Sequence, residues 1–517
     1  MMSGIRLLSF FALSFIASGL GWDSLSLAQH NVISGILYNE DDSNRFMIDP
    51  PGEMTTKTLD KLVDDLAGTH VTTYIICCCA KNANYPSEAW SVYGDGFDPN
   101  LDNTQPFFGD VDPAGRDGLR RWAHNLQKMT AEGIDTNAYM IERSRKKGIS
   151  PWISIRMNDA HDAPLKESPL HSRFFMDHPE FRRKTGSVGA WTDVCLDYGR
   201  PEVRAHAMAL IEEVCSRYDM DGLELDWNRF PLHLKEGEEE LYRDVLTEWM
   251  GEVHEVVKSA EDKWGHPIHL VARVSARPEV AYGIGLDAVE WARKGFIDHL
   301  IVAPFWATTD FNIPVEKWIE NLQGTGVGVT AGLEARVQPY PGGPSLPNTP
   351  DRRRGAALAM LSRGSQGIYL FNYFEVPSAY HDLLNELDSE EVLRQKNRTY
   401  EVTYTDIQIP GDPIPAHLPK TIGKHESAEF EIPIGPKPLP SEVTLSVVYE
   451  STSDNPIYFP VKLNGDPVGR IDYTGRMPID FRALTEGTNR FEIANGMDYP
   501  IVIKQVDLQI SPEDDSR

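Results

Sequence analysis

Residues 219–231 read DMDGLELDWNRFP, and the alternation inside this stretch decides how we interpret the chain around it. Successive side chains of a strand point to opposite faces, so Leu223 and Leu225 share one face while Glu224 and Asp226 share the other. Buried carboxylates are costly without partners, so a purely structural strand rarely holds two of them. We therefore expect a barrel strand whose leucines face the helix layer and whose carboxylates point inward.

On both sides of this strand, short apolar runs alternate with longer amphipathic stretches from about residue 44 to 375. The predicted strands are Arg45–Asp49, Val71–Cys78, Pro151–Met157, Asp221–Asp226, Ile268–Val274, His299–Pro304, Val329–Glu334 and Gly367–Asn372. The predicted helices include Thr55–Leu66, Ala131–Lys147, Pro201–Arg217, Glu238–Lys258, Pro314–Leu322 and Arg352–Arg363. This order predicts an α/β fold, a (β/α)8 TIM barrel over residues 31–395. A doubly wound sheet alternates similarly, but no GxGxxG turn follows the first strand.

After about residue 395 the helical pattern stops, and short alternating strands predict an all-β sandwich domain at residues 400–512. Asn464-Gly465-Asp466 is a strong hairpin turn between two of these strands. The sandwich contains no tryptophan to serve as a flat sugar platform. We therefore expect it to brace the barrel, with carbohydrate binding as the alternative.

Composition and the N-terminus restrict the partners and the location. Asp and Glu outnumber Lys and Arg by 77 to 50, so the net charge of −27 disfavours nucleic acid and anionic membranes as partners. Met1–Arg6 carries one positive charge, Leu7–Ala17 is apolar, and Ser26-Leu27-Ala28 ends in small residues. This pattern predicts a signal peptide over residues 1–28, and hence a secreted or periplasmic protein with no membrane anchor after cleavage. A buried N-terminal helix is the alternative.

Five cysteines are present, three of them in the run Cys77-Cys78-Cys79 at the end of a predicted strand. Export permits disulfides, but an odd number leaves at least one thiol unpaired. We interpret the run as small buried hydrophobic residues, because the CxxC or His spacings of a zinc site are absent. The sequence implies no metal and no cofactor, and it carries no signal for an oligomeric state.

Three neighbouring motifs resemble the glycosyl hydrolase-like 10 family. They are Leu196-Asp-Tyr-Gly-Arg-Pro-Glu-Val-Arg204, then Arg217-Tyr-Asp-Met-Asp-Gly222, then Asp226 with Arg229-Phe-Pro231. The family's pattern is roughly a PEVR helix start followed by YDVDGIhfD..RYP, and the spacing is kept through some 35 residues here. The resemblance implies a (β/α)8 barrel that acts on, or binds, a polysaccharide. The last part of the sandwich resembles the jelly-roll accessory domains found after glycosidase barrels.

The same strand also resembles that of family 18 chitinases, which carry DGxDxDxE. Asp221, Gly222 and Asp226 fit this pattern, but Asn228 stands at the position of the chitinase acid and Glu224 at the middle aspartate. Without an acid at that position, cleavage of N-acetyl sugars lacks its proton donor. We therefore do not expect chitinase activity.

Glycoside hydrolysis needs two carboxylates, and we expect Asp226 and Glu334 to supply them. Asp226 ends its strand on the side where barrel active sites form, and Glu334 ends another predicted strand. Asp226 would be the nucleophile or electrostatic stabiliser and Glu334 the acid or base. Glu375 and Asp310 are alternatives for the second position. Each carboxylate could instead be one half of a structural ion pair. The carboxylates of Asp221–Asp226 would then pair with Arg156 or Arg273, and Glu334 with Arg336 or another barrel arginine.

Other residues at predicted strand ends are candidate substrate contacts, because polar groups orient hydroxyls and aromatic rings stack on the apolar faces of pyranoses. The candidate substrate-binding residues are Glu224, Asn228, Arg229, Asn158, Asp159, Arg273, Trp306, Asn372, Tyr373 and Glu375. His161 and Trp191 lie nearby in the same predicted loops. The sequence thus predicts a secreted glycoside hydrolase for a polysaccharide or oligosaccharide. A lectin-like barrel that binds glycan without cleaving it, and a structural surface-layer protein, are the alternatives.

Overall fold

The computed structural model describes residues 33–184, 189–305, 308–375, 378–404, 416–451 and 459–513, with only the backbone of residues 375, 378 and 379. The predicted signal peptide, residues 1–28, lies outside these ranges. Within them, no helix has both the length and the apolar character needed to cross a bilayer.

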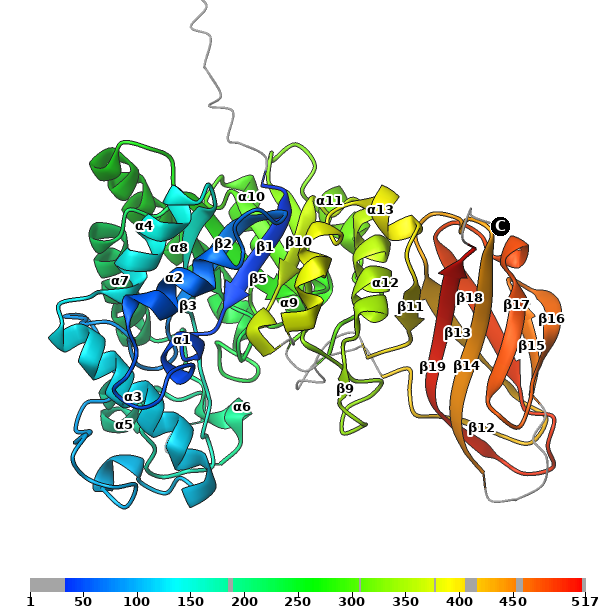
Figure 1. The fold of residues 1–517 in the computed structure, drawn as a ribbon, viewed down its shortest axis with the longest axis horizontal. Coiled ribbons are helices and arrows are strands. Elements are labelled where there is room, and N and C mark those ends of the chain that lie inside the picture. The colour runs from blue at the N-terminus through cyan, green and yellow to red at the C-terminus, as the bar shows by residue number, and fades with distance from the viewer. Residues whose placement is uncertain are drawn as a thin grey trace, which may run out of the picture. The chain divides into compact units, whose positions relative to one another are not determined.

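Eight parallel strands close into a barrel surrounded by helices (Figure 1). Their order around the barrel is β1 (Gly35–Glu40), β10 (Gly367–Leu370), β7 (Gly328–Leu333), β6 (His299–Ala303), β5 (His269–Ser275), β4 (Gly222–Asp226), β3 (Ser150–Arg156) and β2 (Val71–Cys79). Leu223 and Leu225 pack into the large core shared with the helices, while Leu37, Ile75, Val271 and Tyr369 form a separate cluster inside the barrel. The predicted TIM barrel is therefore confirmed.

The main helices of this part of the chain follow the strands. They are α2 (Thr56–Asp64), α3 (Arg116–Ala131), α4 (Thr136–Lys146), α7 (Pro201–Arg217), α8 (Glu239–Trp264), α9 (Pro278–Gly283), α10 (Ala288–Arg293), α11 (Val315–Asn321), α12 (Pro350–Leu361) and α13 (Glu390–Arg394). The single helix predicted over Ala131–Lys147 is wrong, because α3 ends at Ala131 and α4 begins at Thr136. Gly133 takes a left-handed φ of 75° between them, and Asp135 caps α4 by accepting from the backbone N–H of Asn137.

The predicted first strand, Arg45–Asp49, is wrong. The strand is β1, ten residues earlier, and Asn44–Met47 forms a short helix, α1. The apolar run of β1 spans only Ile36–Tyr38, too short to stand out by itself, and pairing with β2 and β10 makes it a strand. Arg45 is fully buried, and its guanidinium donates to the Asn137 side chain at 2.6 Å.

The C-terminal region forms two packed antiparallel sheets, which confirms the predicted sandwich. One contains β11 (Arg398–Glu401), β19 (Ile501–Pro512), β14 (Ser441–Ser451) and β17 (Arg476–Asp480), with β12 (Lys420–Ile422) also paired to β19. The other contains β13 (Ser427–Pro433), β18 (Thr488–Ala494), β15 (Phe459–Leu463) and β16 (Asp466–Ile471). Asn464 and Gly465, with φ of 53° and 94°, turn β15 into β16 as the hairpin motif predicts.

Barrel and sandwich belong to one compact unit, Ile33–Arg517, and β11 lies directly on α12. A Cβ added to Gly355 of α12 would stand 2.3 Å from the carbonyl oxygen of Thr399 in β11. Arg352 of α12 also pairs with Glu401 of β11. Farther along, the hydroxyl of Thr403 donates to the carbonyl of Thr309 at 3.1 Å. The two backbones therefore approach closely along this junction.

Candidate active site

Asp226, the last residue of β4, occupies the end of the barrel where the strands finish. Its carboxylate accepts from the backbone N–H groups of Asn228 and Arg229 at 3.0 and 2.9 Å. The guanidinium of Arg273, on the adjacent β5, donates to both carboxylate oxygens at 2.9 and 3.1 Å. Asp226 is only 1% exposed, so these four hydrogen bonds replace its water shell.

Arg273 joins Asp226 to Glu334, the residue after β7. Its second nitrogen lies 3.4 Å from the Glu334 carboxylate, and its guanidinium stacks over the ring of Phe371 at 4.0 Å. Burial by itself would lower the pKa of Arg273, but the charge of Asp226 raises it above its usual range. Because one guanidinium contacts both carboxylates, these lie at most about 9 Å apart, a span that covers the separations found in glycosidases.

Glu224 lies one layer deeper in the barrel than Asp226. It accepts from the hydroxyl of Ser154 at 2.6 Å, and the hydroxyl of Tyr369 lies 3.4 Å away. Burial, and then the charge of Asp226, raises the pKa of Glu224 to about 7. The inward direction predicted for both carboxylates agrees with these contacts, and Glu224 forms part of the floor below Asp226.

A second arginine, Arg156 at the end of β3, gathers three further carboxylates. Its guanidinium pairs with Asp41, with Asp42 at 3.5 Å and with Asp159 at 3.4 Å. Burial and the charge of Asp41 raise the pKa of Asp42 well above its ordinary value. Burial would raise the pKa of Asp159 as well, but His161 and Arg156 outweigh burial and hold that pKa well below the ordinary value. Asp42 and Asp159 therefore favour opposite protonation states around one cation.

His161 connects the two arginine-centred clusters. Its Nδ1 lies 2.8 Å from Asp159, and Arg229 contacts its Nε2 at 2.9 Å. Since a guanidinium only donates, Nε2 accepts and the imidazole proton sits on Nδ1, toward Asp159. The backbone N–H of Arg229 in turn holds Asp226. Arg229 therefore links the two clusters, because its side chain contacts His161 and its backbone N–H donates to Asp226.

The candidate asparagines mainly bind backbone groups. Asn158 donates to the carbonyls of Leu196 and Leu232 and accepts from the N–H of Leu196, so it ties two loops together. Asn228 donates to the carbonyls of Ala303 and Pro304 at the end of β6. The side-chain oxygens of Asn228 and Asn372 are buried and have no hydrogen-bond partner among the residues that the structure describes.

The aromatic candidates differ in exposure. Tyr373 is only 2% exposed and donates to the carbonyl of Tyr380, so its ring is part of the core. Trp191 is partly exposed and stacks on Phe305 at 5.2 Å, beside Phe230. Trp306 and the side chain of Glu375 lie outside the described residues.

The alternative second carboxylate, Asp310, belongs to a different neighbourhood. It pairs with Arg277 at 3.3 Å and accepts from the backbone N–H of Asn312. Burial raises its pKa. The Arg273 contact therefore distinguishes Glu334 from Asp310 as a companion of Asp226.

The segment that contains β3, β4 and the loops after them decides the relationship to known proteins, because residues 118–266 match the model of one family. That family is glycosyl hydrolase-like 10. The match confirms the resemblance of the sequence motifs. This glycosyl hydrolase-like 10 segment contains Asp159, Asp226 and Arg229, whereas Arg273 and Glu334 follow it in the chain.

Several solved structures of glycoside hydrolases are similar to this chain at low identity. The PgaB (BpsB) glycoside hydrolase domain from Bordetella bronchiseptica is 12% identical, over 69% of this chain and 99% of that one, with a TM-score of 0.40. The chitinase ChiW from Paenibacillus sp. str. FPU-7 is 10% identical, over 92% and 54%, with a TM-score of 0.38. The β-L-arabinopyranosidase from Geobacillus stearothermophilus is 12% identical, over 93% and 98%, with a TM-score of 0.34. At these TM-scores the similarities carry no argument, and no curated protein sequence matches the chain.

The sequence interpretation missed Asp41 and Asp42, which border the site from β1 while the glycosyl hydrolase-like 10 segment borders it from β3 and β4. The available signal was the pair of acids directly after Glu40, the last residue of β1, and placing the strand at Arg45–Asp49 concealed it. Among the described residues, no group of three His, Cys, Asp or Glu side chains is arranged to hold a metal ion. All five cysteines are buried and free.

Proposed function

We propose that this protein is a secreted glycoside hydrolase that cleaves O-glycosyl bonds of a polysaccharide or oligosaccharide with Asp226 and Glu334. The observation that carries the proposal is the meeting of these two carboxylates, from the ends of β4 and β7, on the guanidinium of Arg273. The glycosyl hydrolase-like 10 segment around Asp226 supports the same chemistry. The predicted signal peptide would direct the mature chain, from Gln29, across the membrane, so that it is secreted or periplasmic.

The surroundings of the two carboxylates suggest different roles. Asp226 accepts from two backbone N–H groups and from Arg273, which favours its charged form, so we assign it the nucleophile or stabiliser of the oxocarbenium-like transition state. Glu334 would give its proton to the leaving oxygen as the C–O bond breaks. In a retaining reaction Glu334 would then take a proton from the water that adds to the anomeric carbon, whereas in an inverting reaction Asp226 would take that proton.

Substrate hydroxyls have candidate partners at the end of the barrel where Asp226 lies. The side-chain oxygens of Asn228 and Asn372, which no described residue contacts with a hydrogen bond, would accept from hydroxyl groups, because a buried acceptor gains free energy when it obtains a donor. Arg229 lies beside Asp226 and would donate to a substrate oxygen. We also assign Trp306 and Glu375 to substrate contact. Other candidates would position the residues of the site without touching the substrate: Asn158, Asp159, Arg273, Glu224 and Tyr373.

The test is turnover on a panel of plant and algal polysaccharides, including sulfated ones, with the mature protein. Once a substrate is found, we expect Asp226→Asn and Glu334→Gln each to lower kcat by roughly 10²–10⁴-fold. Asp244→Asn, at an exposed position of α8, is the control and should keep full activity. The proposal fails if Asp226→Asn turns over at the normal rate. The anomer of the first product, followed by NMR, distinguishes retention from inversion.

A second candidate function, glycan binding without cleavage, is favoured by one observation. Asp226 and Glu334 are only 1% and 5% exposed, and both pair with Arg273. A carboxylate paired in this way could serve only to shape a binding site. Glycan binding by the wild-type chain, with no product after long incubation, would support this alternative over hydrolysis.

A further inference from the structure

Two carboxylates, Glu401 and Asp507, face each other on neighbouring strands of the sandwich. Glu401 ends β11 and Asp507 lies on β19, and the antiparallel register places them directly opposite each other. Side chains that are directly opposite in this way share one face of the sheet and lie within reach of each other. Glu401 is 2% exposed and Asp507 is 7% exposed. Like charges at such a position repel, and burial removes the water that would screen them.

One arginine is placed to balance this pair. Arg352 of α12 pairs with one oxygen of Glu401. The other oxygen, Oε2, is buried, and no residue that the structure describes makes a hydrogen bond with it, so a charge there would lack donors. Asp507 accepts from the side chain of Gln509 at 3.1 Å, and Arg476, two strands farther along the same sheet, is exposed to solvent. Charges on both carboxylates would therefore depend mainly on Arg352.

The other charged groups on the far side of Glu401 have partners of their own. Glu401 borders a cavity of about 200 Å³ whose remaining titratable lining residues are Asp310 in the loop after β6, Glu429 and Glu431 on β13, and the exposed His417. Asp310 pairs with Arg277, and Arg490 pairs with both glutamates of β13. These carboxylates therefore do not compete for Arg352.

The pKa values of the two opposed carboxyl groups reflect this surplus of negative charge. Burial raises the pKa of Glu401 to about 7, with Arg352 acting in the opposite direction and Asp507 acting in the same direction. Burial also raises the pKa of Asp507. A carboxyl whose folded pKa lies above its unfolded value stabilises the fold fully below that unfolded value, and this contribution is lost as pH rises through the folded value. Alkaline solution should therefore loosen this part of the fold.

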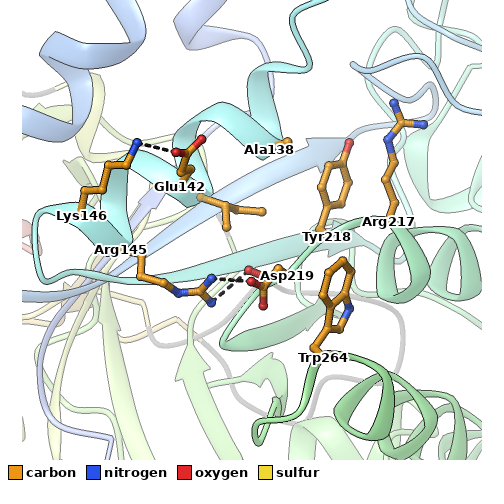
Figure 2. Close-up of a pocket in the computed structure, with 9 residues that line it drawn as sticks. Ala138, Glu142, Arg145, Lys146, Arg217, Tyr218, Asp219 and Trp264 are labelled. Carbon is orange, nitrogen blue, oxygen red and sulfur yellow. Dashed lines mark hydrogen bonds and ion pairs between the residues drawn. The ribbon is translucent and has the colours of Figure 1, made fainter.

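Exposed ion pairs elsewhere in the chain provide a contrast. Arg145 with Asp219, and Lys146 with Glu142, line a cavity of about 450 Å³ beside α4 (Figure 2). Their side chains are at least 41% exposed, so water screens their charges and the pairs contribute little to stability. The side chain of Glu401 is fully buried, so its charge lacks this screening.

We propose that Glu401 and Asp507 form a proton-sharing pair that makes the attachment of β11 to β19 and to α12 depend on pH. When the pair holds one proton, Arg352 balances its single negative charge. When that proton leaves to solvent, two negative charges remain beside one arginine and repel each other across the β11–β19 pairing. Because β11 is the first strand after the barrel, the pair would regulate how firmly the sandwich holds the barrel. This inference does not depend on the proposed hydrolysis.

The test is hydrogen exchange followed by mass spectrometry, with the full mature chain at pH 5.5 and pH 8.0. Each exchange rate is divided by the intrinsic rate at the same pH. The protection of the β11 amides is then expressed relative to that of β15, which removes any change in global stability. We expect this relative protection to be about tenfold lower at pH 8.0 than at pH 5.5. Equal relative protection at the two pH values would overturn the inference.

Two variants assign the change to this pair. Glu401→Gln stays neutral at both pH values, so its relative protection should change less than threefold. Asp507→Asn removes the opposing charge but leaves Glu401 buried, so it should reduce the change without abolishing it, and it replaces Glu401→Gln if that variant does not fold. Glu442→Gln, at an exposed position of β14 in the same sheet, is the matched control and should keep the tenfold change. A tenfold change that persists in Glu401→Gln would show that another group titrates and would refute the pair.

Discussion

Arg273 is the residue on which the two proposed catalytic carboxylates depend. It is 1% exposed and pairs with both Asp226 and Glu334, which are themselves buried. Removing one partner of a buried ionic cluster leaves uncompensated charge, so we expect Arg273→Met to lower the free energy of unfolding by about 3–5 kcal/mol at neutral pH. Urea denaturation measures the loss, with Arg173→Met, at an exposed position, as a control of small effect.

The loss of stability caused by Arg273→Met should also depend on pH. Without Arg273, the charged form of each buried carboxylate loses its partner, whereas the protonated form loses much less. Lower pH favours the protonated forms, so the loss of stability caused by Arg273→Met should be smaller at pH 5 than at pH 8. An equal loss at both pH values would contradict the ionic role of Arg273.

Glu224 supplies a separate titration inside the barrel. Its pKa rises from an ordinary value of 4.5 to about 7 through burial and the charge of Asp226. A carboxyl whose folded pKa is raised stabilises the fold fully below its unfolded value, and this contribution is lost as pH rises through the folded value. We therefore expect Glu224 to contribute a decline of roughly 3 kcal/mol between pH 4.5 and 8.

Glu224→Gln should remove this decline, because the amide stays neutral throughout. The measurement is the free energy of unfolding across that pH range for the wild type and the variant. Glu240→Gln, at an exposed position of α8, is the control and should keep the wild-type slope. Parallel profiles for wild type and Glu224→Gln would show that the carboxyl titrates near its ordinary value.

At the scale of elements, the contact between α12 and β11 depends on a glycine, Gly355, which has no side chain. A methyl group at Gly355 would meet the carbonyl oxygen of Thr399 at 2.3 Å, which forces the helix and strand apart. We expect Gly355→Ala to lower the free energy of unfolding by roughly 1–3 kcal/mol, the usual cost of overpacking. Gly283→Ala in α9 is the matched control, because nothing lies within 4 Å of the added methyl.

Thermal denaturation of the two alanine variants measures the difference. The control should be unchanged or gain up to about 1 kcal/mol, since alanine favours the helix over glycine. If Gly355→Ala is as stable as the control, the close approach of α12 and β11 does not contribute to stability.

For the whole molecule, we propose that the sandwich braces the barrel. Arg352 with Glu401 and Thr309 with Thr403 join the two across α12, β11 and the loop after β6. Deleting residues 400–517 should therefore expose apolar barrel surface and lower both solubility and Tm. The readouts are the soluble yield and a melting curve. A truncated barrel that stays soluble and equally stable, while losing only affinity for a polymeric glycan, would make the sandwich a binding module instead.

Local sequence determined much of this architecture, because periodicity and turn chemistry are properties of neighbouring residues. The alternation of Leu223, Glu224, Leu225 and Asp226 was enough to predict which side chains face the barrel interior. The alternating strands after residue 395 likewise predicted the sandwich, and Asn464-Gly465 predicted its hairpin. The motifs around Asp226 indicated the glycosyl hydrolase-like 10 segment, because they too consist of residues that are close together in the sequence.

Tertiary structure alone decided which charges meet. Glu334 lies 108 positions after Asp226 in the chain, and only closure of the barrel brings both to Arg273. The strand β1 has too few apolar residues to be recognised by itself and is defined by its pairing with β2 and β10. Asp41 and Asp42 therefore join Arg156 through long-range packing. Local sequence patterns do not determine contacts between strands that are distant along the chain.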